Sequence, residues 1–350
     1  MPFYIYLLIM FLAVFWAYII HKSRFCTMGA VSDYLAFGGV NRLQLIAVSM
    51  STSVIGTQLL IYFNLINKEH LPYTTHNIPI FSHLLGGIIF GIGMMLASGC
   101  PTQQCINLGK GNLKSLLSIP LIAVSTQIAI SGSLSNLRLY INNLITISYP
   151  DINIYYNLSG MTIGILLVIF SLMWVIKTSA SKSIMLSILK YGSAIGLIVV
   201  AMWYICGNLA FVPENEITLD YAYLGNSSRN IQSLSMILPY AYLFDWLMYS
   251  SDSMRVLNAN TMLIIGLILG SFMIYILSKK SNANSNLQFF KTPKDFIQYF
   301  FGSIFMGIGG VFALGCSIGQ GLSGFSTLNL GSLVSIIGMY IGAKIIYKHL

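Results

Sequence analysis

Long apolar stretches, each near the length that crosses a lipid bilayer, alternate with short segments that hold most of the charged residues. A helix needs about 20 apolar residues to cross the hydrocarbon core. We therefore predict nine spanning helices, near residues 3–20, 44–65, 80–97, 115–135, 160–176, 185–205, 255–278, 297–314 and 331–347. The apolar segment 237–250 is short, so we expect an interfacial or half-buried helix there. The pattern predicts an all-α polytopic membrane protein.

Composition excludes a soluble protein. The chain is 56% hydrophobic and 8% charged, whereas a typical soluble chain is about 25% charged. The first span has no cationic region before it, and Lys22 and Arg24 follow it, so we expect a retained anchor and not a cleaved signal peptide. No linker suggests a separate soluble domain, so residues 1–350 are predicted to form one integral membrane transport domain.

Lysine and arginine residues concentrate in every second loop. Lys22, Arg24 and Arg42 follow the first span, and the alternation continues to Lys344 and Lys348 at the C-terminus. Cytoplasmic loops carry the excess of these residues, so we place the N-terminus outside and the C-terminus inside. The net charge of +9 fits contact with anionic lipid, and it fits equally a path that concentrates anions.

Two ten-residue segments are close copies of each other. Residues 91–100 (GIGMMLASGC) align without gaps to residues 307–316 (GIGGVFALGC), and six positions are identical. The predicted topology carries the two copies through the bilayer in opposite directions, which predicts an inverted internal repeat of the kind found in many transporters.

A second pair of segments supports the duplication. Asp33 begins a short Tyr- and Leu-containing segment ahead of Arg42, and Asp245 begins a similar one ahead of Arg255. We predict one repeat half at about 21–135 and the other at about 237–347. Connecting spans and an outer loop would fill residues 136–236.

The two copies each end at a Gly-Cys pair where a span breaks. Gly99 precedes a Pro-containing segment, and Gly315 precedes a glycine-rich one, so neither span is expected to continue as a straight helix. Irregular backbone at membrane depth is tolerated where it is buried in protein or lines a wet cavity. Helices restarting near Leu113 and Leu330 would point their positive ends back at the breaks. These features favour an anionic ligand.

The chain has five cysteines: Cys26, Cys100, Cys105, Cys206 and Cys316. The odd number and the lack of a CxxC motif do not indicate a disulfide framework or a structural zinc site. A protonated thiol has a polarizable sulfur and can contact a soft sulfur atom without repelling an anion. We therefore expect the thiols of Cys100 and Cys316, at the duplicated breaks, to contact a sulfur-containing ligand.

Other polar residues leave their roles open. Cys26 lies in a further glycine-containing interruption and is compatible with packing or with function. Cys105 and Cys206 have no repeat partner and are interpreted as packing residues. Asp33 and Asp245 fit helix caps, pairs with Arg24 or Arg255, or a proton relay. Three histidines near the outer face, at the wide spacing of His70, His76 and His83, do not form a convincing metal motif.

Three motifs together resemble the YeeE/YedE family of sulfur transporters. They are Arg24-x-Cys26-x-x-Gly29-Ala-x-x-Asp33, then Gly99-Cys100-Pro, and the more specific string Gly315-Cys316-Ser-Ile-Gly319-Gln320-Gly321-Leu322-Ser323-Gly324. Similar features in the second half, such as Phe211-Val-Pro-Glu and Asp245-Trp-Leu-Met, extend the resemblance over nearly the whole chain.

The resemblance implies import of thiosulfate across the bacterial inner membrane for cysteine synthesis. We expect no cofactor, no bound metal and no nucleic-acid partner. The resemblance also implies that Cys26, Cys100 and Cys316 line the path and pass the ion by S–H···S contacts. The supporting residues would be Arg24, Gly29, Gly99, Gly315, Gly319, Gln320, Gly321, Ser323 and Gly324. A small cytoplasmic sulfurtransferase of the TusA type is the implied partner. Cys105 departs from the family pattern, so the possibility of a second thiol in the path stays open.

Alternative functions remain at this point. A membrane thiol–disulfide oxidoreductase would need paired redox cysteines on one face. A permease for a soft metal would add Met, His or carboxylate ligands to the thiols. The residues also fit a permease for another sulfur or selenium species.

Overall fold

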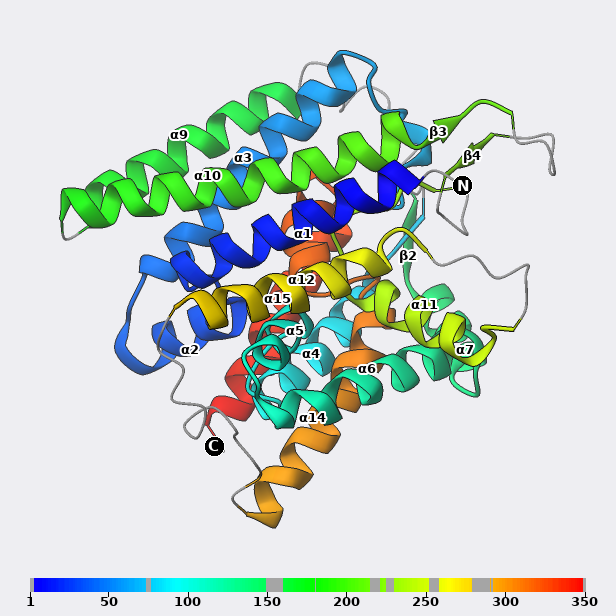
Figure 1. Cartoon of the computed structure of the whole chain (residues 1–350). Coiled ribbons are helices and arrows are strands. Elements are labelled where there is room, and N and C mark those ends of the chain that lie inside the picture. Colours follow the sequence, from blue (N-terminus) through cyan, green and yellow to red (C-terminus); the bar gives the residue numbers. More distant parts are fainter. Residues whose placement is uncertain are drawn as a thin grey trace.

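The computed structural model describes residues 3–73, 77–148, 160–179, 181–214, 221–224, 230–251, 258–278, 290 and 292–348. Helices dominate this part of the chain (Figure 1). The long ones are α1 (Phe3–Ser23), α3 (Asn41–Tyr62), α4 (Ile80–Leu96), α6 (Leu113–Ser131), α9 (Gly160–Thr178), α10 (Lys182–Tyr204), α12 (Thr261–Leu277), α14 (Pro293–Phe312) and α15 (Leu330–Tyr347).

Shorter elements connect or extend the long helices. The short helices are α2 (Thr27–Phe37), η1 (Lys68–His70), α5 (Pro101–Gly109), α7 (Ser135–Leu144), the π-helix η3 (Ile205–Leu209), α11 (Ile237–Met248) and the π-helix η4 (Gly319–Gly324). The strands are β1 (Asn77–Pro79), β2 (Thr146–Ser148), β3 (Phe211–Val212) and β4 (Ala222–Tyr223). β1 pairs antiparallel with β2, and β3 pairs antiparallel with β4.

Eight helical segments of the described residues are long and apolar enough to cross a membrane. They include eight of the nine predicted spans. The ninth, predicted at 255–278, is present as the apolar helix α12, whose 17 residues rise only about 25 Å. The segment predicted at 237–250 is the helix α11, buried at its start and exposed at its end. The chain is therefore an all-α, multi-pass membrane protein.

The distribution of exposed and buried side chains is that of a protein whose outer surface faces lipid. Large apolar side chains face outward, as Phe11 and Leu277 do with 73% and 77% of their surface exposed. Polar side chains fill parts of the interior, among them Gln44, Ser49 and Gln58 on α3. A water-soluble protein has the opposite arrangement, whereas a bilayer accepts exposed apolar side chains and favours polar contacts between helices.

Helices α4 and α14 cross at glycines with their backbones in contact. A Cβ atom on Gly93 would lie 2.7 Å from the carbonyl oxygen of Gly302, and one on Gly309 would lie 2.8 Å from the carbonyl oxygen of Gly86. In the alignment of the two copies, Gly86 corresponds to Gly302 and Gly93 to Gly309. Each contact is therefore the image of the other under a local two-fold axis. Small residues at both positions permit this close approach.

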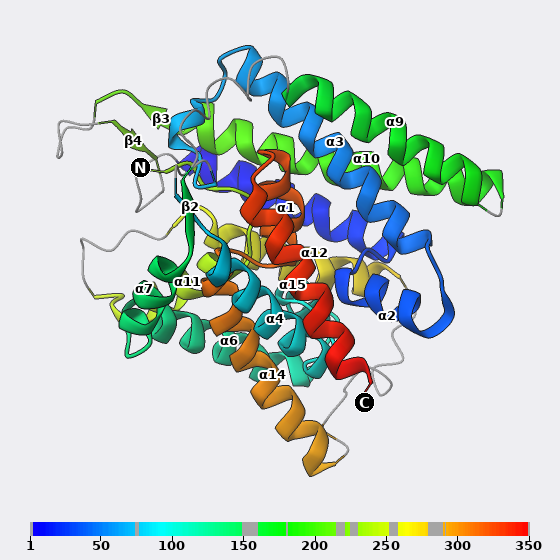
Figure 2. The ribbon, with the colours of Figure 1, turned by 180° about the vertical axis from the view of Figure 1, so that it is seen from behind.

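The helix pairings follow the same symmetry beyond this crossing. Helix α15 packs on α4 and α6 packs on α14, while α3 packs on α10 and α12 packs on α1. Both views show the α9, α3 and α10 group on one side of the molecule and the α4, α14 and α6 group on the other (Figures 1 and 2). The boundaries of two repeat halves stay a prediction. If the repeat halves were defined by these helix pairings, the second half would also contain helix α10, which lies before its predicted start at residue 237.

Segments predicted on one side of the membrane contact each other. β1 and β2 come from two loops predicted outside, and the Nδ1 atom of His70 lies 2.6 Å from the hydroxyl of Tyr223, also predicted outside. On the predicted inner side, the Nζ atom of Lys114 lies 3.8 Å from Oδ2 of Asp295. The chain termini lie at opposite ends of the molecule (Figures 1 and 2).

Candidate functional site

Three helix breaks share one backbone turn. In each, a helix ends at a residue in the left-handed conformation, one residue follows, and then a cysteine precedes the next helix. The left-handed residues are Arg24 (φ 53°), Ser98 (φ 51°) and Leu314 (φ 56°). The cysteines that follow them are Cys26, Cys100 and Cys316. Non-glycine residues rarely adopt this conformation. Its occurrence two residues before each of the three predicted path cysteines shows that the three breaks have the same type of turn.

The next helix begins directly at each break, which corrects the sequence analysis. We expected helices to restart near Leu113 and Leu330. Helices α6 and α15 do begin there, but α5 already starts at Pro101, and residues 317–326 are helical. Proline suits the first helical position because its missing N–H needs no partner there. The glycine-rich segment forms the π-helix η4 and not an irregular loop. Helix N-termini therefore lie at the cysteines themselves.

Cys26 caps helix α2. Its Sγ atom accepts a hydrogen bond from the amide of Gly29 at 3.4 Å. The guanidinium of Arg42 lies against Gly29, where a Cβ atom would collide with it. Arg42 also pairs with Asp33, with 3.2 Å between Nε and Oδ2. A pair with Arg24 was one of the roles that the sequence left open for Asp33, but Arg24 is exposed and Arg42 makes the pair. Arg42 is therefore the cation beside this turn, and sequence reasoning missed it as a site residue.

Cys316 is fully buried and accepts two amide hydrogen bonds. Its Sγ atom lies 3.2 Å from the amide nitrogen of Gly319 and 3.4 Å from that of Met236. The first bond repeats the capping bond of Cys26 at the same spacing of three residues. Met236 comes from the segment before α11, so Cys316 joins the third break to a distant part of the chain.

Contacts between the breaks bring the three cysteines together. The hydroxyl of Thr27 donates to the hydroxyl of Ser317 at 2.9 Å, which joins the residues directly after Cys26 and Cys316. Cys100 lies close enough to both Cys26 and Cys316 for a charge on its thiol to act on them. The first and third cysteine-bearing turns therefore touch, and Cys100 lies within electrostatic reach of both.

Two glutamines fix the paired breaks in the same way. The side-chain amide of Gln104 donates to the carbonyl of Ala97 at 2.9 Å, and that of Gln320 donates to the carbonyl of Ala313 at 2.5 Å. A serine hydroxyl of the following long helix donates to each glutamine oxygen, from Ser115 at 2.9 Å and from Ser332 at 2.6 Å.

Sequence reasoning included Gln320 and missed Gln104. The sequence did contain a signal for Gln104. Gln104 and Gln320 are 216 positions apart, and the two Gly-Cys pairs are separated by the same number of positions.

The remaining cysteines have different surroundings. The Sγ atom of Cys105 lies 2.8 Å from the hydroxyl of Tyr240, which in turn donates to the carbonyl of Pro101 at 2.9 Å. Cys105, interpreted from sequence as a packing residue, therefore belongs to the polar contacts beside the break at Cys100. Cys206 is buried with its Sγ atom 4.0 Å from Oδ1 of Asn260.

The predicted supporting residues lie at the breaks in different ways. The hydroxyl of Ser323 donates to the carbonyl of Leu234 at 3.0 Å. Gly319 packs on Ser235, and Gly324 packs on Ser332. Gly321 is buried, yet a Cβ atom there would meet nothing within 4 Å. Internal space therefore adjoins the π-helix one turn after Cys316.

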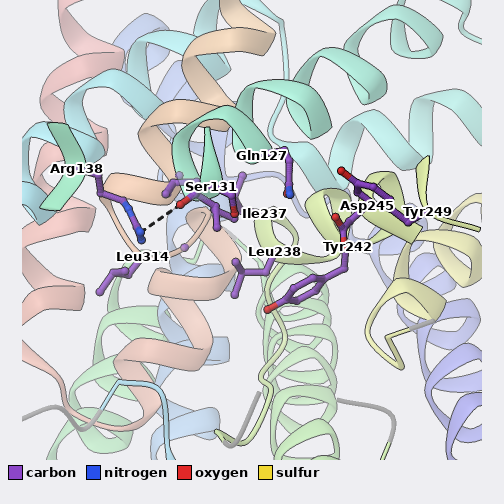
Figure 3. Close-up of a pocket in the computed structure, with 13 residues that line it drawn as sticks. Gln127, Ser131, Arg138, Ile237, Leu238, Tyr242, Asp245, Tyr249 and Leu314 are labelled. Atoms are coloured by element: carbon purple, nitrogen blue, oxygen red, sulfur yellow. Dashed lines mark hydrogen bonds between the residues drawn. The ribbon is translucent and has the colours of Figure 1, made fainter. Parts of the chain in front are cut away.

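A cavity of about 440 Å³ reaches the break at Cys316 from one side (Figure 3). Helix α11 contributes Tyr242 and Asp245, and the ends of α6 and α14 contribute further lining residues, with Leu314 and Gly315 next to Cys316. Arg138 of α7 donates from Nη2 to the carbonyl of Ile130 at 3.3 Å, and its buried Nε atom has no hydrogen-bond partner among the described residues. Sequence reasoning counted Arg138 only as a cation of an outer loop, whereas the structure places it on helix α7 in the wall of this cavity.

Other polar residues considered in the sequence have structural contacts. His83 is buried and its Nδ1 atom lies 2.8 Å from the hydroxyl of Ser335. His76 and Arg255 lie outside the described residues, so the predicted pair of Asp245 with Arg255 is also outside them. Among the described residues, no group of three or more His, Cys, Asp or Glu side chains is placed to hold a metal ion.

These features define the class of protein. Membrane-spanning helices, buried breaks and a local two-fold axis are typical of a membrane transporter. The chain belongs to the sulphur transport family, whose model matches residues 22–345.

Two relatives are each described as the thiosulfate transporter TsuA. The protein from Escherichia coli (strain K12) is 22% identical over 337 residues, which cover 94% of this chain and 91% of that protein. The protein from Spirochaeta thermophila (strain ATCC 700085 / DSM 6578 / Z-1203) is 22% identical over 342 residues, which cover 93% and 92%. The chain is therefore a transporter, and the alternative of a thiol–disulfide enzyme is set aside.

Proposed function

We propose that the protein imports thiosulfate across the bacterial inner membrane, along a path lined by the thiols of Cys26, Cys100 and Cys316, and supplies sulfur for cysteine synthesis. The observation that carries this proposal is the convergence, inside a membrane protein, of three cysteine-bearing turns that share a left-handed residue two positions before the cysteine. Two of the turns are joined by the bond between Thr27 and Ser317.

The chemistry of the turns matches the ion. Thiosulfate is a small dianion with oxygens at one end and a soft sulfur at the other. Helix N-termini at the breaks offer backbone N–H groups and a positive dipole end to the oxygens. Neutral thiols offer weak donors and polarizable sulfur to the terminal sulfur. Transfer between successive thiols by S–H···S contact makes and breaks no covalent bond, so it needs no oxidant or reductant.

The cavity beside Leu314 and Gly315 supports an entry route. Helices α6 and α14 both end at this cavity. The positive-inside rule predicts that these ends face the periplasm. The guanidinium of Arg138 in the cavity wall would attract an anion and lower the cost of removing it from water.

The opposite end of the proposed path is the turn at Cys26. This thiol is half-buried, and Arg42 lies beside it. Under the predicted orientation this turn faces the cytoplasm, so thiosulfate would leave here toward a small sulfurtransferase of the TusA type. The positive charge of Arg42 holds the anion until the partner accepts it.

Uptake of radiolabelled thiosulfate tests the proposal, in cells that lack other importers of sulfur compounds. We expect Cys100→Ala and Cys316→Ala each to abolish or severely reduce uptake while the protein stays folded in the membrane. Cys206→Ala is the matched control, because that cysteine is also buried but lies apart from the breaks, and its uptake should stay near the wild-type level. Wild-type uptake by a well-expressed Cys100/Cys316 double variant would overturn the role of the thiols.

A further inference from the structure

The hydroxyl of Tyr240 lies among the proposed path thiols. Tyr240 is fully buried on the first turn of α11. It lies close enough to Cys100, Cys105 and Cys316 for a charge on any of these thiols to act on it. It therefore brings one oxygen from the second half of the chain to the break at Cys100, where it contacts the carbonyl of Pro101.

The hydrogen bonds of this hydroxyl have a defined direction. Tyr240 donates its single proton to the carbonyl of Pro101 at 2.9 Å. The contact of 2.8 Å with Cys105 must then run the other way, so the S–H group of Cys105 donates to the tyrosine oxygen. A hydroxyl can accept one bond while it donates another. Cys105 thus holds the tyrosine oxygen in place without using its proton.

The proton on the hydroxyl can be redirected at low cost to the fold. Pro101 is the first residue of α5, so helix geometry gives its carbonyl a partner in the amide of residue 105. The carbonyl oxygen of Pro101 therefore accepts the hydrogen bond from Tyr240 in addition to the one from the helix backbone. A ligand oxygen arriving beside Cys100 would offer a charged acceptor, and hydrogen bonds to charged acceptors are stronger.

We propose that Tyr240 is a specificity-determining residue of the path, whose hydroxyl donates to an oxygen of the sulfur oxyanion while the thiols contact its terminal sulfur. Before the ion arrives, the same proton is held by the carbonyl of Pro101. The ligand class is a small oxyanion of sulfur with a soft end. This inference rests on the proposed function, because it assigns one donor within that path.

Transport kinetics of Tyr240→Phe test the assignment, since this variant removes one oxygen atom and keeps the packed ring. We expect the KM for labelled thiosulfate to rise roughly tenfold or more, as loss of one bond to a charged ligand implies. Vmax should change by less than about twofold, because the substitution leaves the path itself in place. Tyr223→Phe is the matched control. That tyrosine is buried and bonded to His70, away from the breaks.

A second variant strengthens the donor in place of removing it. Incorporation of 3-fluorotyrosine at position 240 makes the phenol more acidic, so the KM should fall. Unchanged KM values in both variants, at wild-type expression, would overturn the role of Tyr240. Absence of thiosulfate uptake by the wild-type protein would instead overturn the proposed function, so the two failures are distinguishable.

Discussion

Gln104 and Gln320 occupy equivalent places at opposite breaks and make the same pair of hydrogen bonds. Each amide group ties the end of one helix, at Ala97 or Ala313, to a serine of a later helix. Both side chains are fully buried. A helix end buried in the membrane leaves carbonyl groups without partners, and the glutamines satisfy one of these at each break.

Replacement of Gln104 by Leu should destabilise the protein and disturb the turn at Cys100. The carbonyl of Ala97 and the hydroxyl of Ser115 would lose buried partners, at a cost of ~1–3 kcal/mol for each group left unsatisfied. Thermal unfolding of the purified protein in detergent should show a lower midpoint, with reduced thiosulfate uptake. Gln103→Leu is the control, since among the described residues that amide bonds within its own helix, to Asn107. Equal stability of the two variants would contradict the role of Gln104.

Gly321 should tolerate alanine and reject a large side chain. A Cβ atom at this position meets open internal space, so Gly321→Ala should fold and transport normally. Gly321→Leu would fill that space and should block uptake in a folded protein. Gly93→Ala provides the contrast, because its Cβ would lie 2.6 Å from the amide nitrogen of Met306 and should impair folding. Normal uptake by Gly321→Leu would place the path elsewhere.

A reporter fused to the C-terminus should behave as a cytoplasmic marker. This expectation follows from the alternation of lysine and arginine between loops. Alkaline phosphatase, which is active only in the periplasm, should be inactive there, and a fluorescent protein should fold. A fusion in the connection between α6 and α9, which is predicted outside and holds Arg138, should give the opposite result. Strong phosphatase activity at the C-terminus would refute the predicted orientation and reverse the proposed entry and exit.

Sulfate should compete poorly with labelled thiosulfate. Sulfate has a similar charge and similar oxygens, but it lacks the terminal sulfur that the thiols of Cys100 and Cys316 are proposed to contact. A site built for one contact pattern rejects an analogue that leaves that pattern unmet. The measurement is inhibition of uptake by a large excess of unlabelled sulfate. Equal competition by both ions would describe a general permease for small anions.

Much of the fold followed from the sequence because lipid imposes simple rules. Hydropathy located eight spans and the shorter helix α12, and the Gly-Cys copies located the two equivalent breaks. Pro101 after Cys100 carried a signal for an immediate helix start that the sequence analysis did not use. The π-helix at Gly319–Gly324 had no comparable signal, because glycine has low helix propensity and its helix is maintained by packing on Ser235 and Ser332.

The composition of the site was harder to predict. Cysteines were found because they are rare and duplicated. Tyr240 and Arg42 were missed as site residues. Tyr240 reaches the cysteines from α11 and Arg42 from the first turn of α3, and only the tertiary structure brings them together. Gln104 lies between these cases, because its equivalence to Gln320 is visible in the alignment while its hydrogen bonds are not.

The contact between Gly93 and Gly302, with its image at Gly86 and Gly309, restricts how the path can open. Backbones that approach this closely at four glycines leave little room for side chains to absorb sliding, so a rocking motion of one half against the other would have to separate them. Movement of the short helices after the breaks, α5 and residues 317–326, would disturb far less packing. The crossing therefore acts as a fixed frame, and thiosulfate would pass by local rearrangement of the turns that this frame holds in place.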